Sequence, residues 1–279
     1  MAEITVALIS KLRSRTGAGL GNCRKALMET DGDIEAAIDS LRKKGIATAA
    51  KKAGRSTSEG VIVQVITSGA KSGVIVEINC ETDFVAKNEK FQGFCTEIAE
   101  AYLEDDNANL EEKRVAAVAE IGENIQIARH ERLEVDGSGS IAAYIHHGAK
   151  VGVLVEVSTG KEDTTQADDY KQLVKDITLQ IAAASPTAVT RDELDPALVS
   201  KEKEIAAEQF KDKPPEAVEK ILEGKMEKYY QTVCLLDQAF VKQPESTIKD
   251  QIAAVAKVHD DEISVRRFHR FQVGETADD

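Results

Sequence analysis

The sequence contains an internal repeat, and this repeat limits the folds that the chain can adopt. Residues 60–78 align with residues 139–157 at a constant offset of 79 without a gap, and ten of the nineteen positions are identical. The same offset aligns the apolar positions that follow, so that Phe91 corresponds to Tyr170. The aligned segments hold β-branched runs followed by apolar residues at helical spacing, so each copy is predicted to begin as a β-hairpin followed by a helix.

The repeat resumes further along the chain at a larger offset. Residues 115–119 match residues 252–256 at an offset of 137, and residues from 125 match those from 263 at an offset of 138. Each copy is therefore predicted to have the order β-β-α-α-β. The difference between 137 and 79 leaves 58 additional residues inside the second copy.

These additional residues lie between Ile181 and Ile252 and have the pattern of two helices. A polar turn with two prolines, residues 211–216, separates two apolar stripes. The stripes consist of Leu194, Leu198 and Ile205, and of Val218, Ile221, Leu222, Met226, Tyr229 and Val233. We predict an antiparallel helical hairpin with a narrow seam similar to a two-stranded coiled coil. The hairpin is either a stabilising arm or a surface for a partner or a second copy of the chain.

Three short helices are predicted before the repeat. Their apolar positions are Ile4, Leu8 and Leu12, then Cys23, Ala26 and Leu27, then Ile34, Ala37, Ile38 and Leu41. Residues 16–20 form the tight turn between the first two helices, and residues 31–33 cap the third. This arrangement is similar to the ubiquitin-associated type of helical bundle. Residues 46–58 are small and basic, which predicts a helical turn that leads into a linker.

The charge of the chain is unevenly distributed. Residues 1–55 hold 11 lysines and arginines against 6 acidic residues, whereas residues 56–279 hold 25 against 43. The net charges are thus +5 and −18, within a total of −13. The acidic total argues against a general nucleic-acid binder, because phosphate contacts need a basic face. A basic module on an acidic body suggests docking onto an acidic protein surface, although solvated helix faces explain the same charges.

We therefore predict an α+β protein with a ubiquitin-associated-like bundle and two β-β-α-α-β subdomains. The expected division is residues 1–55 for the helical module with its linker and residues 56–136 for the first repeat. The second repeat takes residues 137–184 and 236–279, and the helical hairpin takes residues 185–235.

Catalytic, metal and membrane functions find no support in the sequence. The nucleotide-binding, hydrolase and zinc-protease motifs are absent. The four cysteines stand outside metal-ligand spacing and are interpreted as buried thiols of a reducing compartment. The chain enters an amphipathic helix directly after Met1 and has no 18-residue apolar run. We expect a cytoplasmic protein that is not an enzyme, needs no cofactor or metal, and does not contact nucleic acid or membrane.

The candidate functional site is a turn between a buried strand and a helix, residues 79–88. An ordinary turn would have Gly, Asn or Ser where this one has Asp83 and Phe84. Phe84 either fills the core between the strand and the helix or anchors a partner. The repeat favours the second interpretation, because the equivalent position of the second copy is Asp163 and the unit therefore folds without an aromatic residue there. Partner anchors of this kind typically contribute ~2–4 kcal/mol of binding free energy.

Four segments give the chain a resemblance to a known family. They are Arg13–Gly19 with Cys23–Leu27, Asn79–Lys87, Ile121–Ile125, and His147–Val155. In this order, and with Thr-Asp-Phe-Val in a strand-to-helix turn, they closely resemble the bacterial elongation factor Ts family. Members of that family are nucleotide exchange factors of elongation factor Tu.

The resemblance implies a partner and a set of binding residues. Thr82, Asp83, Phe84 and Val85 would engage the G domain of elongation factor Tu, with Phe84 wedged between two of its helices. This contact would disturb the Mg²⁺ and phosphate site of the partner, release GDP and allow GTP to bind.

Other parts of the chain would complete this binding. The N-terminal module, with Arg13 and Leu20, would contact the same domain, and His147 and Gly148 would lie near the nucleotide pocket. The second repeat would meet another domain, and in some members the hairpin supports a homodimer.

Two departures from the family pattern stand out. The N-terminal turn has Leu20-Gly21 where relatives often have two bulky apolar residues, and the chain stops soon after Gly274. The alternative functions are a scaffold or adaptor, whose bundle binds a ubiquitin-like or other acidic protein, and an enzyme that uses Asp83. Co-purification with elongation factor Tu, and not with a ubiquitin-like protein, would favour the family function over the adaptor. Turnover of a substrate without a second protein would favour the enzyme.

Overall fold

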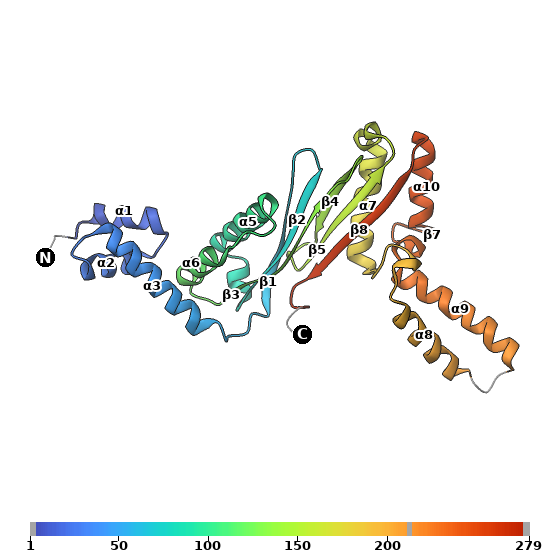
Figure 1. Ribbon diagram of the computed structural model, residues 1–279, viewed down its shortest axis with the longest axis horizontal. Coiled ribbons are helices and arrows are strands. Elements are labelled where there is room, and N and C mark those ends of the chain that lie inside the picture. The colour runs from blue at the N-terminus through green and yellow to red at the C-terminus, as the bar shows by residue number, and fades with distance from the viewer. Residues whose placement is uncertain (1–3, 211–213, 276–279) are drawn as a thin grey trace.

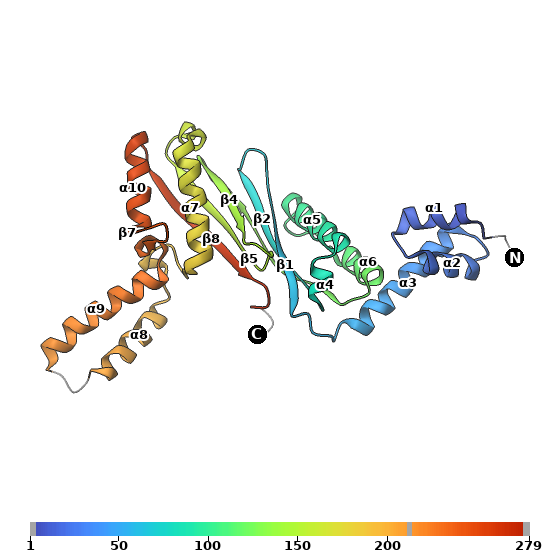
Figure 2. The same ribbon diagram turned by 180° about the vertical axis from the view of Figure 1, so that it is seen from behind.

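The protein, seen here in a computed structural model, combines helices with small antiparallel sheets, which confirms the α+β class. The structure describes residues 4–210 and 214–275. Figures 1 and 2 show an elongated molecule with a helical module at one end, two sheets in the middle and a pair of helices projecting from the other end. Within the described ranges, no helix has both the length and the hydropathy needed to cross a membrane.

The helical module consists of α1 (Val6–Thr16), α2 (Leu20–Glu29) and α3 (Ile34–Lys52). Thr5 caps α1 and Asp33 caps α3 through side-chain oxygens, and Gly17 ends α1 in the left-handed region at φ 68°. The buried centre of the module is formed by Leu12, Cys23, Ala26, Leu27 and Ala37.

The linker is shorter than the sequence predicted, because α3 continues through residues 46–52. Ala49 is buried in the core of the first sheet. A β-carbon added at Gly45 would lie 3.5 Å from the β-carbon of Ala119 on α6 (Glu111–Ile121). Small residues on α3 therefore let it pack closely on α6, and the small composition that suggested a linker is explained by this packing.

The first repeat forms a three-stranded sheet in the order β1-β2-β3. Its strands are β1 (Glu59–Ile66), β2 (Ser72–Cys80) and β3 (Ile125–Glu134), and its other helices are α4 (Asp83–Ala86) and α5 (Glu89–Glu104). The apolar face of α5 packs on the central strand β2, and Phe91 is fully buried there. Both neighbours of β2 are antiparallel to it, and a β-bulge interrupts the β2–β3 pairing after Glu77.

The second repeat forms a sheet in the order β4-β5-β8. Its elements are β4 (Gly139–Ile145), β5 (Val151–Thr159), the 3₁₀ helix η1 (Glu162–Gln166), α7 (Asp168–Ala184), α10 (Ile248–His259) and β8 (Ile263–Gln272). Tyr170 is buried under this sheet, and the β5–β8 pairing has its bulge after Glu156, 79 residues beyond Glu77.

The two sheets meet through reciprocal contacts. The amide of Ile62 donates to Ala149 O, and the amide of Ile141 donates to Ala70 O, both at 2.7 Å. A β-carbon added at Gly152 would lie 2.5 Å from the side chain of Ile62. Glycine is needed there, because any larger residue would push the sheets apart.

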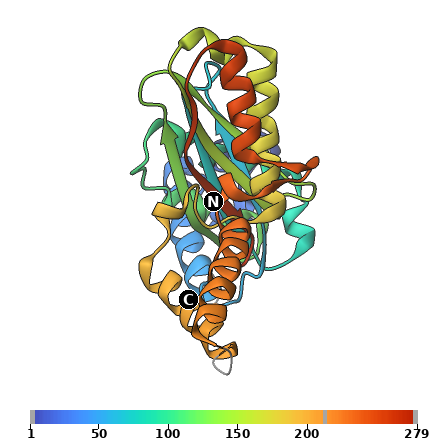
Figure 3. The ribbon, with the colours of Figure 1, turned by 90° about the vertical axis from the view of Figure 1, so that its right-hand side faces the viewer.

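The insertion in the second repeat contains α8 (Pro196–Gln209) and α9 (Pro215–Val233), which project from the body in Figure 3. The turn predicted at 211–216 falls partly outside the described residues, which omit 211–213. The stripe predicted for α8 was wrong, because Leu198 is 55% exposed and Ile205 is 46% exposed. Ala206, next to Ile205, is the buried residue of this helix.

Short elements that the sequence pattern did not predict close the insertion. They are η2 (Arg191–Glu193), η3 (Leu235–Asp237), β6 (Ala239–Phe240) and β7 (Gln243–Thr247). The two ends of the helical pair lie side by side, because the Leu235 amide donates to Ala188 O at 2.9 Å. The pair of helices is thus attached to the body through one narrow base.

Candidate functional site

The turn after β2 is an ordered single helical turn, α4. Thr82 caps it, because its Oγ1 accepts a hydrogen bond from the Val85 amide at 3.3 Å. Asn88 then caps α5 by accepting from the Lys90 amide at 2.9 Å. Ala86 is buried against the first core. With both ends capped and one side buried, the turn presents its remaining side chains in a fixed direction.

Phe84 points into solvent from this turn, and its residue is 81% exposed. The neighbouring Val85 packs partly against the core. The second copy has η1 at the same place, where Asp163 is exposed and Thr164 is buried. The expectation that Phe84 is exposed is confirmed, and the alternative that it fills the core is wrong. An aromatic ring left in water by an ordered backbone is typical of a binding anchor.

Asp83 begins α4 and forms an ion pair with Lys87, with 2.7 Å between Oδ2 and Nζ. The hydrogen bond from Lys87 is the main reason why the pKa of Asp83 is lowered from its usual value. Asp83 is therefore an anion at neutral pH, and it places a negative charge beside the exposed ring.

A carboxylate from the other side of the first repeat holds the base of this turn. Glu123 Oε2 accepts hydrogen bonds from the amides of Glu81 and Thr82 at 3.1 and 3.0 Å, and its Oε1 accepts from Thr82 Oγ1 at 2.7 Å. The sequence reasoning assigned no role to Glu123, although it lies in the Ile121–Ile125 segment that carried the family resemblance. We call Glu81, Thr82, Glu123 and Asn124 the clamp.

The clamp also connects the turn to the end of the helical module. Glu81 Oε1 accepts from the Asn124 amide at 2.6 Å, and this bond is the main reason why the pKa of Glu81 is lowered. The Asn124 side chain, which is fully buried, donates to Arg55 O at 2.9 Å. The segment that leaves α3 and the turn that carries Phe84 thus share one hydrogen-bonded network.

Replacing Glu123 with alanine is expected to lower the free energy of unfolding by ~1–3 kcal/mol, because two half-buried amides lose their acceptor. The amides of Glu81 and Thr82 should also lose protection in hydrogen exchange. Glu120→Ala serves as the control, because the exposed Glu120–Lys90 ion pair should contribute under ~1 kcal/mol. Equal unfolding free energies for the two variants would show that the clamp does not stabilise the turn.

His147 and Gly148 lie in the turn between β4 and β5. His147 is exposed, and Gly148 has φ 88°. Lys150, at the end of this turn, forms an ion pair with Glu59 at the start of β1. Glu59 is paired with Cys80, the last residue before the clamp. The structure therefore brings this turn and the Phe84 turn to the same end of the first sheet.

Arg13 and Leu20 lie apart from these turns, in the helical module. Arg13 is exposed in the last turn of α1, and Leu20, the first residue of α2, is 55% exposed. Met28 is also exposed, two helical turns beyond Leu20 on the same side of α2. Figure 2 shows α3 between the first two helices, α1 and α2, and the Phe84 turn with α4.

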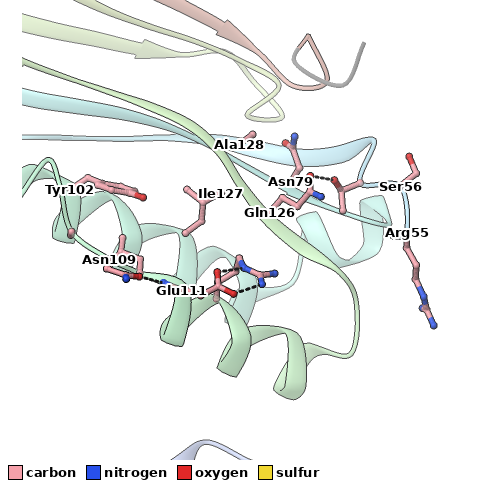
Figure 4. A pocket seen from close by; sticks show the side chains of 13 residues that line it. Arg55, Ser56, Asn79, Tyr102, Asn109, Glu111, Gln126, Ile127 and Ala128 are labelled. Atoms are coloured by element: carbon pink, nitrogen blue, oxygen red, sulfur yellow. Dashed lines mark hydrogen bonds and ion pairs between the residues drawn. The ribbon is translucent and has the colours of Figure 1, made fainter. Parts of the chain in front are cut away.

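A cavity of about 750 Å³ lies near the clamp, at the edge strand β3. Figure 4 shows the side chains that line it. Arg55, Asn79, Tyr102 and Gln126 are among the residues that line it. Glu111, the carboxylate in its lining, is held by the guanidinium of Arg114 at 2.6 Å. The lining thus offers neither a free carboxylate nor a histidine for acid–base chemistry.

The residues that the structure describes form no group of three or more His, Cys, Asp or Glu side chains able to hold a metal ion. All four cysteines are buried free thiols, as expected from the sequence. The fold and the turn define an α+β protein that offers an ordered, solvent-facing aromatic and acidic pair.

Comparisons with known proteins assign this protein to a family. The family described as "Elongation factor TS" matches residues 81–275. Elongation factor Ts of Trichlorobacter lovleyi is 42% identical, with 98% of this chain and 93% of the relative covered. Elongation factor Ts of Symbiobacterium thermophilum is 43% identical, with 99% of this chain and 93% of the relative covered. Elongation factor Ts of Nitratidesulfovibrio vulgaris is 38% identical, with 98% of this chain and 97% of the relative covered. The chain belongs to the elongation factor Ts family, and its role is that of a translation elongation factor.

Proposed function

We propose that the protein binds the GDP complex of elongation factor Tu and promotes release of GDP, so that GTP can bind. Membership of the family supports this function. The observation that carries it is the exposed ring of Phe84, which the clamp and the caps of α4 hold in one position. A preorganised anchor loses little conformational entropy when a partner buries it.

Each candidate residue has a part in this proposal. Phe84 enters between two helices of the partner's G domain, while Asp83, Thr82 and Val85 fix its position. His147 and Gly148 contact the partner near its nucleotide pocket, since their turn lies at the same end of the first sheet. Arg13 and Leu20 extend the contact along the G domain through the helical module.

The proposed mechanism is thermodynamic linkage. If the exchange factor and the nucleotide weaken each other's binding, the coupling free energy is the same in both directions. The bound factor then accelerates loss of GDP, and incoming GTP expels the factor. A small displacement of a partner helix is sufficient, because Mg²⁺ demands nearly ideal octahedral coordination.

The proposal assigns the Mg²⁺ and the nucleotide to the partner, and this chain acts without a cofactor and without catalysing a reaction. It places the protein in the cytoplasm, where translation takes place. The chain divides into a ubiquitin-associated-like module, residues 1–55, and two subdomains, residues 56–136 and residues 137–279, with the hairpin inserted in the second. In this scheme, the hairpin is a surface for self-association or for a partner.

Release of a fluorescent GDP from elongation factor Tu tests the function directly. With excess unlabelled GDP present, adding this chain should accelerate the loss of fluorescence, and the rate should saturate as its concentration rises. The control is the same titration with heat-unfolded chain. An unchanged release rate, with complex formation also undetectable, would contradict the proposal.

A further inference from the structure

Helices α6 and α10 occupy equivalent places in the two repeats, and α6 has the helix α3 packed along it. Residues 112, 116, 119 and 120 of α6 correspond to residues 249, 253, 256 and 257 of α10 at the offset of 137. These positions lie on one side of each helix, since the last three follow the first by four, seven and eight residues. On α6 this side meets α3, whereas Figure 3 shows α10 on the outside of the molecule with no helix in front of it.

The side of α6 that meets α3 shows what such a surface binds. Small residues let the helices approach, because a β-carbon added at Gly45 of α3 would lie 3.5 Å from Ala119. Charges fix the pairing, because Arg42 of α3 forms an ion pair with Glu112. Near the end of α6, Lys52 of α3 donates a hydrogen bond to the Gly122 carbonyl. A basic helix with small residues thus lies along an acidic helix with small residues.

The same side of α10 keeps the small residues and reverses the charges. Ala253 and Ala256 stand where α6 has Ala116 and Ala119, and Ala253 is exposed. Lys249 and Lys257 stand where α6 has Glu112 and Glu120. Both lysines are exposed, and neither forms an ion pair with another residue that the structure describes.

The acidic side chains near Lys249 and Lys257 do not neutralise the positive charge of these lysines. The carboxylate of Asp250 is turned back onto Thr247, where it accepts hydrogen bonds from both the amide and the hydroxyl. Asp260, just beyond the helix, lies 3.9 Å from Lys161 Nζ, and His259 contacts Asp169. The side of α10 defined by Lys249, Ala253, Ala256 and Lys257 is here called the α10 face.

We propose that the α10 face binds an acidic helix of a partner protein, with small residues at the line of contact. The basic α3 is excluded from this face by like charge, which also keeps the helical module of the same chain or of a second copy on α6. An acidic helix meets the lysines of α10 as Arg42 of α3 meets Glu112 of α6. The second repeat thereby gains an interaction surface separate from the Phe84 turn.

A pair of synthetic helices tests this proposal. The first has the sequence of α3, residues 34–52, with Arg42→Glu and Lys52→Glu, and the second keeps the native charges. Both are stapled on the side opposite Gly45 to hold them helical. At low ionic strength, the charge-reversed peptide should bind the intact protein about tenfold more tightly, as two exposed ion pairs replace two repulsions. Fluorescence anisotropy of labelled peptides gives the affinities.

Charge exchange on the protein completes the test. The double variant Lys249→Glu/Lys257→Glu should reverse the preference and select the native-charge peptide. Lys220→Glu/Lys228→Glu on α9 is the matched control, because it makes the same charge change at the same spacing and should keep the original preference. Thermal melts establish that both variants are folded. Equal affinities of the two peptides, or a preference that survives in the α10 variant, would overturn the proposal.

A second copy of the chain as the occupant would also overturn it. Sedimentation of the intact protein and of the Lys249→Glu/Lys257→Glu variant distinguishes this case. We expect the same oligomeric state for both. Self-association that the substitutions abolish would show that the α10 face is an interface between copies.

Discussion

Replacing Phe84 with alanine is expected to slow the stimulated release of GDP from elongation factor Tu by about tenfold or more, which corresponds to ~1.4 kcal/mol or more. The ring makes little contact with its own chain, since the residue is 81% exposed. Its removal should therefore lower the free energy of unfolding by less than ~1.5 kcal/mol. Thermal melts and release of fluorescent GDP, compared at equal concentrations of folded protein, measure both effects.

Phe91→Ala is the matched control for this substitution. Phe91 lies seven residues further on, is fully buried in the first core and corresponds to the buried Tyr170 of the second repeat. Its truncation should cost ~3–5 kcal/mol of stability. The fraction that remains folded should exchange GDP almost normally. The opposite ranking, an early melt and normal exchange for the Phe84 variant, would show that Phe84 supports the fold and not the partner contact.

The repeat could be recognised in the sequence because its identical residues include those that make the reciprocal contacts between the two sheets. Ile62 and Ile141 donate across the junction to Ala149 and Ala70. These two alanines have φ 55° and 53°, an uncommon conformation that the local turn fixes in both copies. The structural demands of the junction therefore appear in the sequence as identities at a constant offset.

The packing of α8 could not be predicted in the same way. Leu198 and Ile205 are seven residues apart and suggested one stripe, but the helix buries Ala206 instead. Three apolar residues on a two-helix seam are too few to fix which side faces inward, and a small residue allows a closer approach than a large one. The repeat gave no help, because the first copy has no equivalent of this helix.

The clamp illustrates a second limit of sequence reasoning. Periodicity locates the strand and the helix around the Phe84 turn, and the second copy shows that Phe84 is dispensable for the fold. A hydrogen bond from the amide of Thr82 to the side chain of Glu123, 41 residues away, leaves no periodic signal. The exposed position of Phe84 was thus predictable, while the group that holds its turn in position required the structure.

Removing the helical module is expected to abolish most of the affinity for elongation factor Tu, and the structure shows where the cut must be made. Deletion of residues 1–44 removes α1, α2 and the first half of α3 but keeps Gly45 and Ala49, which pack on α6 and in the first core. This truncated chain should remain folded. Its affinity should fall by about a hundredfold, or ~2.7 kcal/mol, because the proposed contacts of Arg13 and Leu20 with the partner are lost.

Deletion of residues 1–55 provides the comparison, because it removes the same proposed docking surface and also the contacts that α3 makes with the body. Ala49 then leaves the first core, and the buried side chain of Asn124 loses its acceptor, Arg55 O. An unpaired buried polar group costs ~1–3 kcal/mol, so this chain should be less stable than the 1–44 deletion by at least that amount. Urea unfolding and calorimetric titration with elongation factor Tu should thus give similar affinities but different stabilities for the two deletions.

If the 1–44 deletion bound as tightly as the full chain, the docking role inferred from the basic module would be wrong. If the two deletions were equally stable, residues 45–55 would act only as a linker, as their composition first suggested.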